Sequence, residues 1–342
     1  MGVQHQFCRR SGRGRAAIIS TIDTADSAQP FDFFGVVEAA GDSPAGNYSA
    51  WSQTSAALRR LESVTSRSKY EIMAIAYDAA KWELNYSLAG EFEPGRPYLV
   101  AQFLPQAGGV PAACRAAVGP VPPPCTPAVV QRGLAVGCTA DEVRTLCAGT
   151  APVWVVAVHL NHYFLTSFHP PHVDAVIPGA VLAKALSDAS AATGADIAAG
   201  SVIMFGDWNE FEWADFTDPG GFPNCRKDAQ ARMAPLWEGF FSGRMSDAVS
   251  PRTVSCCTKW AAGDRDPYPE WRFEYDHIFH SSDLALAPGS NAPAFLPYDY
   301  PGVAAPGCGD AFCTGENPPG NVTARSQGSW HRAVHATFQR SA

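Results

Sequence analysis

The sequence predicts a single folded domain of the α+β class, with buried strands inside and helices on the outside. Short runs of apolar and β-branched residues recur along the chain and are bounded by Gly, Pro or Asp, as buried strands usually are. Between these runs, Ala and Leu recur at helical spacing, which is typical of helices that cover a sheet. No change of composition marks a linker, so one unit is expected.

The apolar runs predict the strands in chain order, and two amphipathic stretches predict helices. The strands are expected at residues 31–37, 70–77, 98–103, 153–160, 201–205, 275–279 and 333–338. The helices are expected over residues 52–63 and 173–193.

Three segments do not follow this pattern. Residues 1–15 form a basic tail, expected to be solvated, and residues 16–342 form the domain. A surface insertion is expected at about residues 105–150, because five prolines stand between positions 120 and 127 and four cysteines are nearby. A Gly- and Pro-rich loop is expected at about residues 287–329.

Charge and hydropathy exclude several classes of function. The chain of 342 residues has 25 Lys plus Arg against 33 Asp plus Glu, a formal charge of -8. This balance argues against binding nucleic acid or anionic lipid through bulk charge, so phosphate would be met locally. The longest apolar runs are far shorter than the roughly 20 residues that cross a bilayer, so no transmembrane helix is expected.

Cysteines and glycosylation sequons predict a secreted or lumenal protein. The chain has ten cysteines, and Asn47, Asn85 and Asn321 each begin an Asn-x-Ser/Thr sequon. Disulfides are expected among Cys114, Cys125, Cys138 and Cys147, and between Cys308 and Cys313. No signal peptide is visible in this sequence, and an intracellular protein with free thiols is the alternative.

Polar residues stand where several predicted strands begin or end. The run 201–205 leads into Gly206-Asp207-Trp208-Asn209, in which Asp207 and Asn209 share one side of an extended chain. A carboxylate and an amide together suit a hard cation or a phosphoryl oxygen. Similar positions are held by Glu38, His159, Asp276 and His331.

In this order, the motifs resemble those of the endonuclease/exonuclease/phosphatase superfamily, which has the deoxyribonuclease I-like fold. The resemblance runs from about residue 31 to residue 338 and rests on five segments. They read Val37-Glu38, Ala157-Val158-His159-Leu160, Gly206-Asp207-Trp208-Asn209, Asp276-His277-Ile278-Phe279 and Ser329-Trp330-His331-Arg332.

The resemblance implies a four-layer sandwich of two packed mixed β-sheets flanked by helices, with a metal-dependent phosphoesterase site at one edge. Glu38 and Asp207 would hold Mg²⁺ or Mn²⁺, and Asp207 and Asn209 would orient the attacking water. His331, held by Asp276, would act as general base or electrostatic partner.

The resemblance also implies residues that contact the phosphate. His159 would donate a hydrogen bond to the leaving group or the transition state, and Asn209 would bind the phosphate. Arg96 resembles the phosphate-contacting Arg of the family, and Glu71 would support His159.

Departures from the family pattern leave alternatives open. Residues 3–8 offer no equivalent of an early Asn, Val37 replaces a Gln, and Trp330 replaces the Asp before the last His, which is expected to weaken metal binding. A folded relative without catalysis, used for binding, is therefore one alternative. A separate zinc site is another, formed by His159, His162, His169 and His172.

The expected function is hydrolysis of phosphodiester bonds, with nucleic acid favoured as the substrate and a monomeric state expected. The alternatives are a sphingomyelinase-like activity and an inositol-phosphate phosphatase activity. Tyr268, Trp260 and Trp271 would suit a membrane-docking loop. The aromatic residues Trp208, Phe211, Trp213 and Phe216 are expected to pack a loop more than to stack on a base.

Overall fold

The computed structural model describes residues 2–3, 12–40, 48–68, 71–92, 95–106, 112–118, 127–140, 143, 152–160, 177–208, 233–248, 276–287, 294–295 and 334–340. The strands are β1 (Gly2–Val3), β2 (Phe33–Ala40), β3 (Glu62–Arg67), β4 (Glu71–Tyr77), β5 (Trp82–Phe92), β6 (Arg96–Pro105), β7 (Val153–His159), β8 (Ser201–Asp207), β9 (Met245–Asp247), β10 (Asp276–Ser281), β11 (Leu284–Leu286), β12 (Ala294–Phe295), β13 (Val334–Ala336) and β14 (Phe338–Arg340). The helices are α1 (Gly12–Ala28), α2 (Tyr48–Ser52), α3 (Ala56–Arg60), α4 (Ala112–Val118), α5 (Pro127–Ala135), α8 (Pro178–Thr193) and the π-helical η1 (Pro235–Phe240).

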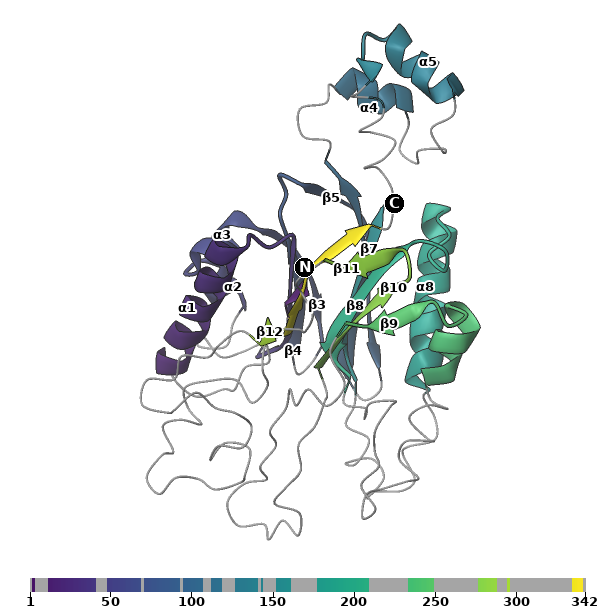
Figure 1. Ribbon diagram of the computed structural model, residues 1–342. Helices are drawn as coiled ribbons and strands as arrows, with labels where there is room; N and C mark the ends of the chain where they lie inside the picture. Colours follow the sequence, from purple (N-terminus) through teal and green to yellow (C-terminus); the bar gives the residue numbers. More distant parts are fainter. Residues whose placement is uncertain are drawn as a thin grey trace, which may run out of the picture.

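Two layers of β-structure stand face to face (Figure 1). The larger sheet has six strands in the order β5-β6-β7-β8-β10-β9, and within it β7 and β8 are parallel while the other pairs are antiparallel. The second layer contains the antiparallel sheet β2-β4-β3. β1 contacts β2 and pairs with β13, which extends this layer.

The core between the sheets is built from alternate residues of the facing strands. Phe33, Ile75, Phe103, Val155 and Phe205 are among the buried residues that meet there. The sheets approach closely where Phe205 lies against Gly35, and a Cβ at Gly35 would overlap the Phe205 ring. Glycine is therefore required at this position by packing.

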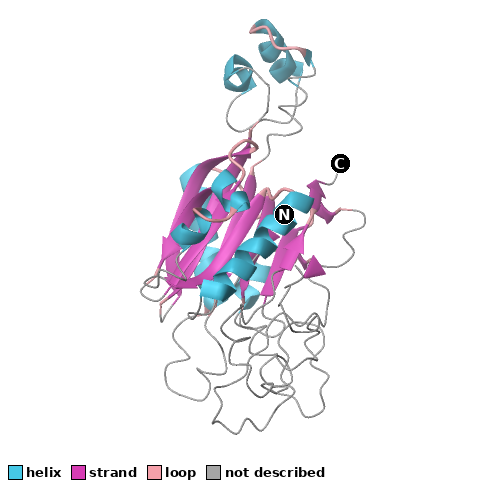
Figure 2. Cartoon of the chain, turned by 90° about the vertical axis from the view of Figure 1, so that its left-hand side faces the viewer, coloured by secondary structure: helices cyan, strands magenta, loops and turns pink. Residues whose placement is uncertain are grey.

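Helices cover the outer faces of both sheets, which gives four layers (Figures 1 and 2). α1, α2 and α3 lie on the smaller sheet, where Ile22, Trp51 and Leu58 join its outward-facing residues in one core. α8 and η1 lie on the larger sheet, where Leu186 and Trp237 pack in a second outer core. The predicted four-layer α+β sandwich is confirmed, with antiparallel pairing among the described strands of the second layer.

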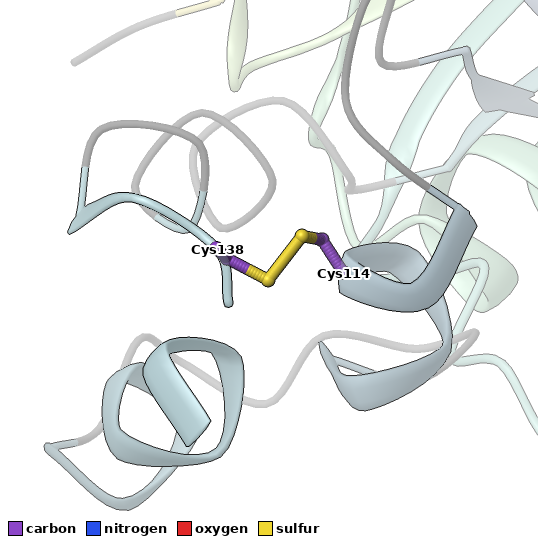
Figure 3. Close-up of a disulfide and its surroundings, with 2 residues drawn as sticks. All are labelled: Cys114 and Cys138. Carbon is purple, nitrogen blue, oxygen red and sulfur yellow. A yellow bond between two sulfur atoms is a disulfide. The ribbon is translucent and has the colours of Figure 1, made fainter. Parts of the chain in front are cut away.

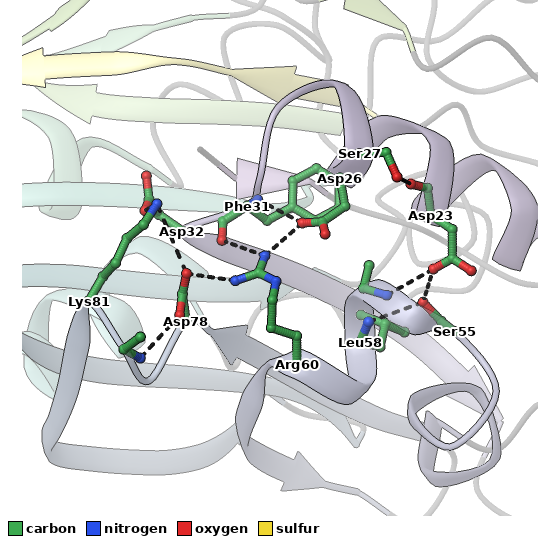
Figure 4. Close-up of polar contacts among 12 residues, drawn as sticks. Asp23, Asp26, Ser27, Phe31, Asp32, Ser55, Leu58, Arg60, Asp78 and Lys81 are labelled. Carbon is green, nitrogen blue, oxygen red and sulfur yellow. Dashed lines mark hydrogen bonds and ion pairs between the residues drawn. The ribbon is translucent and has the colours of Figure 1, made fainter.

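A polar network fastens the helices to the smaller sheet (Figure 4). Arg60, at the end of α3, donates to Asp26 of α1 at 2.7 Å and to Asp78, just after β4, at 2.6 Å. Lys81 lies 2.8 Å from Asp32. Because exposed ion pairs contribute at most about 1 kcal/mol each, the network serves mainly to orient α1 and α3.

The edge strand β5 changes the face that carries its apolar residues. Trp82 and Leu84 pack in the core between the sheets, whereas Tyr86 and Leu88 pack in the outer core under α8. In a regular strand all four would point to one side. The pairing register with β6 shifts between Leu84 and Tyr86, so Asn85 is the extra residue of a β-bulge that turns the strand over.

The expected insertion contains two helices, α4 and α5, which Figure 1 shows beyond the end of the sheets where β6 ends and β7 begins. Cys114 and Cys138 are joined by a disulfide and have Cα atoms 5.8 Å apart (Figure 3). They form a small core with Val129 and Val143. Cys125, Cys147, Cys308 and Cys313 lie outside the described residues.

Local signals mispredicted some boundaries. The expected helix 52–63 is wrong: it is divided, because Ser55 caps a new helix by accepting from the Leu58 N–H, and the chain enters β3 at Glu62. The expected boundary at residue 15 lies within α1. α8 begins at Pro178, and the expected strand 333–338 is described as the separate strands β13 and β14. No helix in the described ranges is both long and apolar enough to span a membrane.

Candidate functional site

Three polar residues at the ends of adjacent strands form a row at one edge of the larger sheet. His159 is the last residue of β7, Asp207 is the last of β8, and Asp276 is the first of β10. The strand register pairs His159 with Asp207 and Asp207 with Asp276. Because β7 and β8 are parallel and β10 is antiparallel to them, all three meet at the same edge.

The row is buried. His159 and Asp276 are 0% exposed and Asp207 is 1% exposed. A carboxylate that loses water in this way costs folding free energy unless charged or hydrogen-bonding groups surround it. Asp207 and Asp276 therefore require charged or hydrogen-bonding groups around them.

His159 contacts residues from both layers. Its Nδ1 lies 2.8 Å from Glu71 Oε2, and Glu71 is the first residue of β4. Its Nε2 lies 3.4 Å from Asp207 Oδ2. The imidazole thus bridges carboxylates of the two sheets.

Arg96, the first residue of β6, contacts both Glu71 and His159. Its Nη1 is 3.2 Å from Glu71 Oε2 and 3.0 Å from His159 Nδ1. A carboxylate only accepts, so the contact with Glu71 requires a protonated Nδ1 that donates to Oε2; because a guanidinium only donates, Arg96 then donates to the same carboxylate oxygen and not to Nδ1. In this assignment Glu71 fixes the orientation of the ring and leaves Nε2 directed toward Asp207.

Gly206 allows β7 and β8 to approach closely beside the row. A Cβ at this position would overlap the carbonyl oxygen of Val158 on β7. Any other residue would push the strands apart next to His159 and Asp207. The Gly of the Gly-Asp-Trp-Asn segment is therefore explained by packing between strands.

The other expected site residues are described in part or not at all. Glu38 lies in β2, where the register with β4 shifts between Val36 and Ala39, so the backbone has a bulge at Val37 and Glu38. Bulges are common next to functional sites because they redirect side chains. The side chain of Glu38 and all of Asn209 and His331 lie outside the described part of the chain.

The acidic residues at this sheet edge are of the chemical type that hard cations bind. Glu71, Asp207 and Asp276 are buried acids beside one Arg and one His, and Glu71 Oε1 is buried without a hydrogen bond to any described group. Carboxylate oxygens are ligands that Mg²⁺ and Mn²⁺ prefer. Within the described ranges no three His, Cys, Asp or Glu side chains are close enough to hold an ion, so a ligand such as Glu38 would be needed.

A second carboxylate–imidazole pair was not foreseen. His277 Nδ1 lies 2.6 Å from Asp247 Oδ2 of β9, and the imidazole ring stacks on Phe279 at 5.4 Å. Phe279 packs edge-on against Trp208, which is 3% exposed, so Trp208 packs the outer core. The signal in the sequence was a His next to Asp276 in an otherwise apolar strand.

The chain is similar to solved structures over nearly its whole length. A mannosyl-6-phosphatase from Bacteroides thetaiotaomicron is 12% identical, with 99% of this chain and 98% of that chain covered and a TM-score of 0.51. An endonuclease/exonuclease/phosphatase family protein from the same organism is 11% identical, with 100% and 97% covered and a TM-score of 0.50. One from Leptotrichia buccalis is 9% identical, with 99% and 98% covered and a TM-score of 0.50. No protein-family model and no curated protein sequence matches the chain.

Proposed function

We propose that this chain, which has the deoxyribonuclease I-like fold, is a divalent-metal-dependent phosphodiesterase that hydrolyses nucleic acid. The observation that carries the proposal is the buried row of His159, Asp207 and Asp276 at one sheet edge. Burying two carboxylates and an imidazole together lowers the free energy of unfolding, because each group loses its hydrating water. A catalytic function at this sheet edge would explain why the chain keeps these residues despite the loss of stability.

His159 acts on the leaving-group side of the phosphate. With its Nδ1–H donated to Glu71, 2.8 Å away, the ring presents Nε2 as the second donor when it is protonated. Nε2–H can then stabilise charge on a phosphate or leaving oxygen. Asp276, expected to hold His331, belongs to the opposite side of the reaction, where Asp207 and Asn209 would orient the attacking water and His331 would act as general base or electrostatic partner.

Arg96 supplies positive charge for the phosphate. Its side chain is 29% exposed, while the Glu71 carboxylate that it contacts is 4% exposed. A guanidinium anchored on a buried carboxylate has a fixed orientation, which suits bidentate contact with phosphate oxygens.

Mg²⁺ or Mn²⁺ is the ion that fits the donor set, with Glu38 and Asp207 as the residues that would hold it. When bound, the ion supplies positive charge that neutralises the phosphate and favours attack. Trp330, in place of an acidic residue in the motif Ser329-Trp330-His331-Arg332, leaves fewer carboxylates for the ion.

Nucleic acid is favoured over phospholipid and inositol phosphate as the substrate. The chain carries a net charge of -8, so an anionic polymer has to be met through Arg96 and the ion and not through bulk attraction. Trp260, Tyr268 and Trp271, which would suit a membrane-docking loop, lie outside the described residues.

A secreted or lumenal location and a monomeric state complete the proposal. Cys114 and Cys138 form a disulfide within the insertion, whose hydrophobic core is too small to be stable by itself. Disulfides that stabilise small cores in this way are typical of proteins in oxidising compartments. Mass mapping under non-reducing conditions tests the location: free thiols at both positions would contradict it.

The decisive assay measures hydrolysis of DNA, RNA, sphingomyelin, inositol phosphates and a sugar phosphate, with and without a chelator. Metal-stimulated cleavage of DNA or RNA is expected, together with a loss of about a hundredfold or more in Asp207→Asn. Asp188→Asn is the matched control, because Asp188 is an exposed carboxylate on α8 that pairs with Lys184. No turnover on any substrate, with no thermal stabilisation by Mg²⁺, would support a binding protein without catalysis.

A further inference from the structure

β5 presents a long unpaired edge. It is the first strand of the larger sheet and, at 11 residues, the longest strand described. It pairs with β6 on one side, and no described strand pairs with its other side. Long edge strands invite pairing with other chains, so folded proteins protect them with charges, bulges or covering groups.

The bulge at Asn85 lies within this edge. Asn85 is the residue that the pairing register with β6 skips, and its side chain is exposed. The residues on either side are fixed, because Leu84 packs in the core between the sheets and the Tyr86 ring contacts Trp154 at 6.1 Å between ring centroids. The bulge therefore holds Asn85 outward at a defined position.

Asn85 also begins the sequon Asn85-Tyr86-Ser87, and Ser87 is exposed. We propose that Asn85 carries an N-linked oligosaccharide when the chain passes through a secretory compartment, and that this glycan shields the edge of β5. This inference rests on the proposed secreted or lumenal location and does not depend on the proposed phosphodiesterase activity.

The chemistry of the modification is compatible with the contacts of Asn85. Nδ2 attacks the anomeric carbon of a polyprenyl-diphosphate-linked oligosaccharide: the C–N bond forms, the C–O bond to diphosphate breaks, and Nδ2 loses one proton. Nδ2 keeps its other hydrogen. The contact from Nδ2 to Gln102 Oε1 of β6, at 2.5 Å, needs only one hydrogen, so it can persist after modification.

The chain offers a matched control for the experiment. Asn47-Tyr48-Ser49 has the same three residue types as Asn85-Tyr86-Ser87, so local sequence preference is equal at the two positions. Ser87→Ala removes the sequon in β5 and leaves Asn85 and its contact with Gln102 unchanged. Ser49→Ala removes the sequon at Asn47 and leaves those at Asn85 and Asn321 in place, and Ser87→Thr keeps the sequon at Asn85.

The full chain, fused to a secretion leader, would be expressed in a eukaryotic cell line, and the peptide containing Asn85 analysed by mass spectrometry. Wild type and Ser87→Thr are expected to carry a glycan on Asn85, and Ser87→Ala none. Light scattering at rising protein concentration should show an associated fraction about threefold larger or more for Ser87→Ala than for wild type or Ser49→Ala.

Two outcomes would overturn the proposal. An unmodified Asn85 in the secreted wild-type protein would refute the modification. Association of Ser87→Ala that equals that of Ser49→Ala would refute the shielding of β5, even if Asn85 is glycosylated.

Discussion

At the scale of single residues, Glu71 determines how His159 is held. The two residues are 88 positions apart in the chain and belong to different sheets. Arg96 contacts both of them, so one carboxylate organises a cation and an imidazole. Loss of the charge on Glu71 would release the ring orientation and leave Arg96 without its buried counter-charge.

Glu71→Gln is expected to lower kcat by about ten- to a hundredfold with a smaller change in KM, because the amide can still accept from Nδ1 but no longer places a negative charge beside His159 and Arg96. Steady-state kinetics on the cleaved substrate would measure this. Glu83→Gln, on the exposed side of β5, is the control. An unchanged kcat in Glu71→Gln would exclude Glu71 from the site.

Because of Tyr77, the free energy of unfolding of the protein is expected to depend on pH in the alkaline range. Burial and the hydrogen bond from its hydroxyl to Glu62, at 2.9 Å, raise the pKa of Tyr77 to about 12. Because this pKa is above the unfolded value of about 10, the folded state binds the tyrosine proton more tightly than the unfolded state does. The stabilisation is complete below pH 10 and is lost as the pH rises toward 12.

The free energy of unfolding of the wild type is therefore expected to fall between about pH 10 and pH 12 by up to about 2 kcal/mol more than that of Tyr77→Phe. Urea denaturation at several pH values would give the difference. Parallel curves for the two proteins would show that the folded state does not perturb Tyr77.

At the scale of elements, β-bulges decide which residues reach which core. In β5 the extra residue Asn85 sends Trp82 and Leu84 to one face and Tyr86 and Leu88 to the other. A period of two predicts a single face for all four residues. The bulge in β2, at Val37 and Glu38, lies in the strand that carries the expected metal ligand.

Deletion of Asn85 should destabilise the protein by about 2–4 kcal/mol, because one pair of apolar side chains would have to face the wrong side of β5. Asn85→Ser keeps the number of residues and should change the stability by less than about 1 kcal/mol. Thermal and urea denaturation of both variants would test this. Equal stability of the deletion and the substitution would mean that the bulge is dispensable.

At the scale of the whole molecule, the insertion and the site lie at opposite ends of the larger sheet. The insertion follows the end of β6 and precedes the start of β7, whereas Arg96 begins β6 and His159 ends β7. β6 and β7 are antiparallel, and Phe103 pairs with Val153 at the insertion end. The two strands therefore form a hairpin whose connection is long but whose ends are close.

Replacement of residues 107–151 by a short Gly- and Asn-rich turn should preserve the fold and leave kcat/KM within about threefold of the wild type. Circular dichroism and the hydrolysis assay would measure both properties. The control is Cys114→Ser with Cys138→Ser, which keeps the insertion but removes its disulfide. Loss of activity in a correctly folded replacement would mean that the insertion contributes to the site.

The sequence by itself indicated the buried strands β2, β4, β6, β7, β8 and β10 along the chain, and the polar residues at their ends. Buried strands such as β7 and β8 are short apolar runs, and a carboxylate or imidazole directly after such a run is a local signal. Asp276 was recognised in the same way, because it lies next to the apolar residues of β10. The half-exposed strand β5 was missed, because an edge strand has no continuous apolar run.

Only the tertiary structure decided which of these residues meet. The contact of His159 with Glu71 requires the two sheets to pack face to face, and the pair His277–Asp247 requires β9 to lie beside β10. The bulge at Asn85 likewise depends on tertiary packing, because the apolar side chains of β5 are buried in two different cores. Local preference along the chain cannot specify such contacts, because the burial of apolar faces on partners distant in sequence determines pairing and register.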